Sequence, residues 1–237
     1  MVLASIGGDL ATIRAFEAVS VVLYGAVLVW LLRMRHPLYL GAFIGGTLVF
    51  AFDWHWTTNG FFRATFNEHL VPIPGIGIGG QHEPLAIPLN YGFGFGLPAV
   101  LYAMKHKWME QRFGRWKVPA IWLGGAIGVG IYEIPVVHLL GIWTYHQRPG
   151  FEVLGFPWSN FWFGANLIAG SCVGVAAMAR WAQIPERAGF SLRDETTWKG
   201  LVMGATPVMV AFYLTGLLQL WWYSAAQPWI SPSPRPF

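Results

Sequence analysis

The sequence is short of charged residues and of cysteine. Only 11% of its 237 residues are Asp, Glu, Lys or Arg, whereas a soluble domain carries roughly 25%. The single cysteine, Cys172, excludes a disulfide within the chain. Hydrophobic residues make up 55% of the chain. This balance is typical of an integral membrane protein rather than a soluble domain.

Several sequence motifs that mark enzymes are missing. The seven histidines form no H-x-x-H, H-x-x-x-H or E-x-x-H pair, so the ligand sets of di-iron and zinc enzymes are not present. There is no Walker loop and no G-x-S-x-G motif. The glycines of GFGFG (92–96) lie inside an apolar run, which favours a close-packing surface over a nucleotide loop. We therefore expect no metal and no cofactor.

Apolar runs of about 20 residues are long enough to cross a bilayer as helices. Six such runs predict an all-α membrane bundle of about six transmembrane helices. Because no polar linker divides the chain, residues 1–237 are expected to form one domain. The predicted spans are approximately 14–34, 38–57, 86–104, 119–142, 158–180 and 200–223.

The basic residues predict how this bundle is oriented. Eleven of the 15 Lys and Arg lie in the connections between spans one and two, three and four, and five and six. Since positive loops stay in the cytoplasm, we expect a multi-pass protein of the inner (cytoplasmic) membrane with both termini outside. The basic stretch 105–117 is expected to be a solvated cytoplasmic loop near anionic lipid. Basic residues spread over separate loops do not form a nucleic-acid patch.

Four acids lie in or beside apolar runs, where a carboxylate is costly and usually faces the bundle interior. Glu17, Asp53 and Glu133 fall within predicted spans, and Glu83 directly precedes the third span. The expected orientation brings all four to the outer leaflet. Each also has a structural explanation, such as a helix cap or a hydrogen bond to a neighbouring helix; Glu133, in mid-helix before Pro135, has the weakest one.

The stretch WHWTTNGFFRATFNEHL (54–70) follows the second apolar run and is rich in aromatic, amide and charged residues. It opens a long connection, and long ordered connections are often functional. We therefore expect it to form the rim or lid of an outer-leaflet pocket, with VPIPGIGIGG (71–80) as an interfacial segment. The candidate substrate-contacting residues are Tyr132, Trp143, Tyr145, Asn90, Trp56 and Asn59. The alternative for the aromatic residues is an interfacial belt.

Several segments together resemble the AveC-type spirocyclase family of bacterial membrane proteins. They are FEAVSVVL, FDWHWTTNGFFRATFN, QHEPLAIPLNYGF, YEIPVVHLLGIWTYH and GFPWSNFWFGANL, in this order over residues 14–182. The acidic positions of the family fall on Glu17, Asp53, Glu83 and Glu133. The chain differs from the family after Pro157, where Ser159 and Asn160 stand in place of an acid.

The resemblance implies a cyclase or dehydratase that closes spiroketals from dihydroxy-ketone polyketides without a cofactor. Polyketide- or terpenoid-like lipophilic substrates fit this chemistry. Glu133 is expected to be the general acid and Asp53 the base, since differently buried carboxyls can hold different protonation states. The alternative is a non-catalytic accessory or lipid-binding subunit of a larger membrane complex. A protein partner or a homo-oligomer is left open, and a proton channel is a third, weaker alternative.

Overall fold

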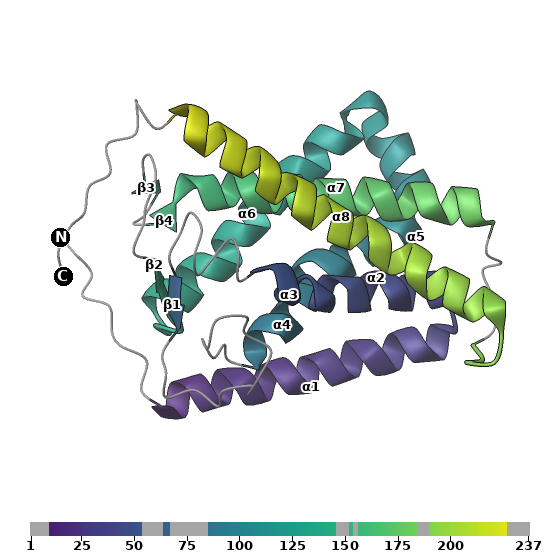
Figure 1. The fold of residues 1–237 in the computed structure, drawn as a ribbon, viewed down its shortest axis with the longest axis horizontal. Coiled ribbons are helices and arrows are strands. Elements are labelled where there is room, and N and C mark those ends of the chain that lie inside the picture. The colour runs from purple at the N-terminus through teal and green to yellow at the C-terminus, as the bar shows by residue number, and fades with distance from the viewer. Residues whose placement is uncertain are drawn as a thin grey trace.

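The computed structural model describes residues 10–53, 64–66, 85–145, 152–153, 156–183 and 190–226. In this part of the chain the fold is helical, as expected, apart from two short antiparallel strand pairs. The elements are α1 (Leu10–Met34), α2 (Pro37–Leu48), α3 (Phe50–Asp53), β1 (Ala64–Phe66), α4 (Ala86–Tyr91), the π-helix η2 (Gly92–Gly96), α5 (Leu97–Phe113), the 3₁₀ turn η3 (Gly114–Trp116), α6 (Lys117–His138), β2 (Trp143–Tyr145), β3 (Glu152–Val153), β4 (Phe156–Pro157), α7 (Trp158–Ala182) and α8 (Glu195–Ala226). α1 and α7 run along the long axis of the molecule, and α8 crosses α7 obliquely (Figure 1).

Four helical stretches of the described residues are long and apolar enough to cross a membrane. They are Ala11–Met34, Ala86–His138, Trp158–Ala182 and Glu195–Gln219. The second contains α4, η2, α5, η3 and α6, and the chain turns between α5 and α6 at η3 (Figure 1). These helices indicate a multi-pass membrane protein.

Two predicted boundaries differ from the structure. The second span was expected over 38–57, but α2 has only 12 residues and ends at Leu48, after the weak helix formers Gly45, Gly46 and Thr47. The stretch 105–117 was expected to be a loop, but α5 continues through it to Phe113. Its Lys, Met, Glu, Gln and Arg residues are good helix formers. The helix ends at Gly114, whose φ of +50° suits glycine.

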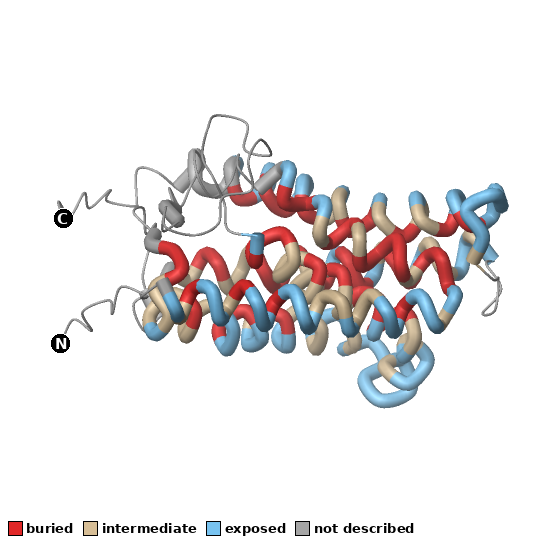
Figure 2. The backbone as a smooth tube through the Cα atoms, turned by 90° about the horizontal axis from the view of Figure 1, so that it is seen from below, coloured by how far each residue is buried: buried red, intermediate tan, exposed pale blue. Residues whose placement is uncertain are grey.

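The core lies where α8 packs between α2 and α7, while α5 and α6 both pack on α7. Buried residues concentrate on these facing sides and exposed ones on the outer faces (Figure 2). Close approach of α2 and α8 depends on glycine: a Cβ at Gly41 would meet the backbone of Leu201, and one at Gly204 would meet that of Leu38. Small residues at such crossings are the usual means of helix association in membranes.

Polar contacts connect the helices at a few buried places. The Tyr24 hydroxyl lies 2.8 Å from the Thr47 hydroxyl and joins α1 to α2. The Trp122 indole donates to Asn166 Oδ1 at 3.2 Å and joins α6 to α7. At the exposed end of α5 and α6, Lys117 lies 2.8 Å from Glu110. Since apolar contacts between helices bring little in lipid, such bonds help fix which faces meet.

Candidate functional site

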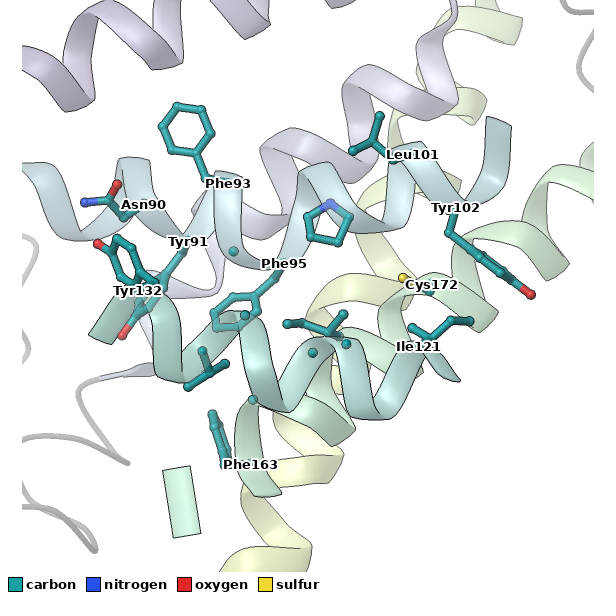
Figure 3. Close-up of a pocket in the computed structure, with 18 of the residues that line it drawn as sticks. Asn90, Tyr91, Phe93, Phe95, Leu101, Tyr102, Ile121, Tyr132, Phe163 and Cys172 are labelled. Atoms are coloured by element: carbon teal, nitrogen blue, oxygen red, sulfur yellow. The ribbon is translucent and has the colours of Figure 1, made fainter. Parts of the chain in front are cut away.

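A cavity of about 650 Å³ lies between the α4–η2–α5 segment and α6, with α7 behind it (Figure 3). Its size is within the range of small-molecule sites, about 300–1,000 Å³. Aromatic and aliphatic side chains from all of these elements form most of its wall. They include Phe93 and Phe95 of η2, Leu101 of α5, Ile121 of α6 and Phe163 of α7.

Glycine residues, which have no side chain, leave room for the cavity. Gly94 of η2 and Gly124 and Gly128 of α6 line it, and a Cβ built on any of them would meet nothing within 4 Å. Gly96, two residues from Gly94, does the opposite, because a Cβ there would lie 2.7 Å from the Phe43 Cα of α2. The prediction that GFGFG is a close-packing surface is thus confirmed for Gly96 but not for Gly94.

One end of the cavity is polar. Glu133 of α6 and Asn160 of α7 both line it, and the Asn160 carboxamide nitrogen donates to Glu133 Oε2 at 3.3 Å. Asn90 of α4 lines the same cavity, and its carboxamide nitrogen donates to the Ser20 hydroxyl of α1 at 3.4 Å. Asn160 is only 6% exposed. Two amides of the cavity wall are therefore held in place by contacts with neighbouring helices, and one of them contacts the carboxyl group.

The cavity opens sideways, between α5 and α6. Among its lining residues, Leu101 is 46% exposed, Trp108 55% and Tyr132 38%. The outer surface of α6 beside the opening carries Leu123, Ile127 and Ile131, all exposed. The surface beside the opening is therefore apolar and belongs to an apolar helix of membrane length.

The structure places the four predicted acids differently. Glu133 lines the cavity, whereas Glu17 is not among the lining residues. Glu17 is buried, and its Oε1 accepts a hydrogen bond from the Leu85 backbone N–H at 3.1 Å, which fixes the start of α4 against α1. This contact fits the structural alternative for Glu17. Asp53 is the last residue of α3, but its side chain is not described, and Glu83 lies outside the described residues.

Three of the six predicted contact residues, Asn90, Tyr132 and Trp143, line the cavity. Tyr145 lies in β2, with its side chain not described, and Trp56 and Asn59 lie outside the described residues.

One piece of the predicted rim can be placed. β1, from the 54–70 stretch, pairs with β2, and Phe66 stands opposite Trp143 in the register. The backbone of that stretch therefore passes beside a residue of the cavity wall. The rest of the stretch, and the 71–80 segment, lie outside the described residues.

Sequence reasoning did not select Asn160 or the cavity-lining glycines as site residues. A signal for Asn160 existed, since Ser159 and Asn160 form a polar pair in the first turn of the otherwise apolar helix α7. Within the described ranges no group of three His, Cys, Asp or Glu side chains is placed to hold a metal ion.

Comparison of the chain with known proteins gave no match to a family model, to a curated protein or to a solved structure. The resemblance to the AveC-type family therefore stays a prediction.

Proposed function

We propose that the chain is a membrane-embedded cyclase or dehydratase that acts on a lipophilic substrate by carboxyl acid–base chemistry. The observation that supports it most is the position of Glu133, which stands at the polar end of an apolar cavity that opens sideways. Active sites are typically apolar cavities with a few converging polar groups. The polyketide- or terpenoid-like substrate class follows from the family resemblance.

The chemistry needs only proton transfer. In spiroketal closure a substrate hydroxyl oxygen bonds to a ketone carbon, its proton goes to a base, and the ketone oxygen receives a proton from an acid. That oxygen then takes a second proton from the acid and leaves as water, and the second hydroxyl oxygen bonds to the same carbon and gives its proton to the base. The two protons taken up equal the two released, and no electron leaves or enters the substrate. Glu133 is the acid of this scheme, and Asp53, at the end of α3, is the proposed base. Positioned acid–base groups typically contribute 10²–10⁴-fold to such steps.

We also propose the finer membrane arrangement: about six spans, both termini outside, and the inner membrane as location. Its support is the concentration of 11 of the 15 Lys and Arg in alternate connections. In this arrangement α5 and α6 are separate spans, and α2 with α3 belongs to the second span.

The test of catalysis is Glu133→Gln, which keeps the shape of the side chain but loses the transferable proton. Purified protein in nanodiscs is incubated with a lipid extract, and mass spectrometry follows products that have lost one water. We expect the variant to lose such products by about 10²–10⁴-fold while its thermal unfolding is unchanged. Glu195→Gln is the matched control, because Glu195 is exposed in the first turn of α8. Equal product formation by the Glu133 variant and the control would remove Glu133 from the mechanism.

A non-catalytic lipid-binding or accessory subunit is the second candidate. One observation favours it: among the described residues that line the cavity, Glu133 is the one acid. If the unaltered chain forms no product from any extract but still retains a lipid, this second candidate replaces the first.

A further inference from the structure

The polar end of the cavity combines a carboxyl group with a carboxamide. Glu133 supplies the carboxyl group, which as the proposed acid is protonated and carries one O–H donor. The nitrogen of Asn160 is already used in the contact with Glu133. The other carboxamide atom, Asn160 Oδ1, is buried and has no hydrogen-bond partner among the residues that the structure describes. A buried acceptor of this kind is costly until a donor reaches it.

In the described wall of the cavity, positive charge lies far from this end. Lys105 is the one basic residue there, and it stands 15 residues after Asn90 along the helical α4–α5 segment. At the helical rise this is about 22 Å. An anionic head group placed beside Glu133 would therefore have no cation beside it in the described wall to offset the cost of its desolvation.

The space between the polar end and Lys105 suits a long apolar chain. On α6 the wall runs from Glu133 to Ile121, a distance of about 18 Å along the helix. Figure 3 shows Phe93, Phe95 and Leu101 on one side of this space and Ile121 on the other. The surface beside the opening between α5 and α6 is apolar, which suits a ligand that is not soluble in water.

We infer that the cavity binds a membrane-soluble alcohol whose hydroxyl group donates to Asn160 Oδ1 and accepts from the protonated Glu133 carboxyl group, with its apolar chain directed toward Lys105. A hydroxyl supplies the missing donor without a charge that must be desolvated, whereas an ammonium group would lose its hydration on entry. The inference names the substrate class for the proposed function and rests on it. Asn160 is then a positioning and specificity residue, since its nitrogen donates to Glu133 and its oxygen accepts from the ligand hydroxyl.

The test compares head groups on one chain length. Purified full-length protein in detergent is loaded with radiolabelled hexadecanol, and unlabelled hexadecanol, hexadecyl methyl ether, hexadecanoate and hexadecylamine compete for it. The methyl ether has the same chain but no donor. We expect hexadecanol to bind up to about tenfold more tightly than the ether, as one hydrogen bond donated to the buried Asn160 oxygen allows. Hexadecanoate and hexadecylamine should both be weaker competitors than the alcohol.

Three variants locate the effect. Gly128→Phe places a ring in the open space of the cavity and should abolish binding of every competitor. Asn160→Leu should bring the alcohol and the ether to equal affinity. Asn166→Leu, the same change six residues further along α7, is the control, since Asn166 bonds to Trp122 and Trp162 and does not line the cavity.

The outcomes separate the two proposals. Equal binding of alcohol and ether by the unaltered chain, or tightest binding of the acid or the amine, overturns the alcohol assignment and leaves the proposed function standing. Hexadecanol binding that survives Gly128→Phe overturns both, because the cavity would not be the ligand site. The head-group series uses the unaltered chain, so it decides the question even if Asn160→Leu does not fold.

Discussion

Replacing Gly45 by alanine should separate α2 from α8. A carbon added at Gly45 would lie 2.6 Å from the Ala205 Cα and 2.8 Å from the Ala205 backbone oxygen, whereas ordinary van der Waals contact begins near 3.4 Å. The obstructing atoms are backbone, so no side chain can rotate away and one helix must move. Overpacking of this kind typically costs about 1–3 kcal/mol. Gly45→Val should cost more, because its branched side chain adds two further carbons at the same place.

Gly25→Ala is the control for this change. Gly25 also lies inside a helix, α1, but a Cβ there would meet nothing within 4 Å. With no clash, only the helix propensity remains, and alanine is favoured over glycine by about 0.5–1 kcal/mol in a helix interior. The two variants should therefore shift stability in opposite directions.

The assay is thermal unfolding in detergent, followed by circular dichroism on the unaltered chain and the three variants. Gly45→Ala should unfold at a lower temperature than the unaltered chain, Gly45→Val lower again, and Gly25→Ala at the same or a higher temperature. If Gly45→Ala and Gly25→Ala unfolded together, the close approach of α2 to α8 at Ala205 would be refuted, and with it the account of how the core is held.

Two further predictions concern Glu17 and the topology. Glu17→Leu removes the acceptor for the buried contact with the Leu85 N–H and should lower the free energy of unfolding by about 1–3 kcal/mol. Glu17→Gln keeps an acceptor oxygen, so its free energy of unfolding should fall by less. A Glu17→Gln variant that keeps its stability but loses product formation would restore Glu17 to the catalytic group. A cysteine at Lys107 should react with a membrane-impermeant maleimide in whole cells only after the membrane is opened, since native Cys172 is 2% exposed and adds little background; labelling of intact cells would reverse the proposed orientation.

Hydropathy predicted the existence of the long helices well, because apolar residues in a run of membrane length have few other places to go. The predicted 158–180 span corresponds to Trp158–Ala182, and 14–34 to Leu10–Met34. Hydropathy predicted the ends of the helices less well, since it measures the preference of side chains for water or lipid and not their helix propensity. The second span shows this: the run stays apolar after Leu48, but the helix does not continue unbroken through it.

The candidate site was harder to predict, because sequence shows which residues are glycine but not what each glycine faces. Gly94 and Gly96 have similar apolar neighbours in the sequence, yet one borders open space and the other contacts α2. The π-helix that carries them changes the direction of successive side chains relative to an α-helix. A sequence pattern based on the α-helical period therefore does not predict which way each residue of this segment faces. The acid at the site was predictable for a different reason. Glu133 lies in the middle of an apolar helix, where the free-energy cost of a carboxyl group makes an acid without a function uncommon.

That cost bears on why an acid stands at this place. A carboxylate within a membrane helix is unfavourable by about 2.5–3.5 kcal/mol, and a hydrogen bond to a charged group contributes about 1.5–3 kcal/mol. By itself, the Asn160 contact thus gives folding no clear gain over this cost. Asn160 in turn keeps a buried oxygen without a partner in the described part of the chain, which adds a further cost. A leucine at each position would avoid both penalties, and apolar replacements of buried polar pairs are often neutral or stabilising. The contact with Glu133 therefore does not account for the buried oxygen of Asn160, whereas a ligand that donates a hydrogen bond to this oxygen does.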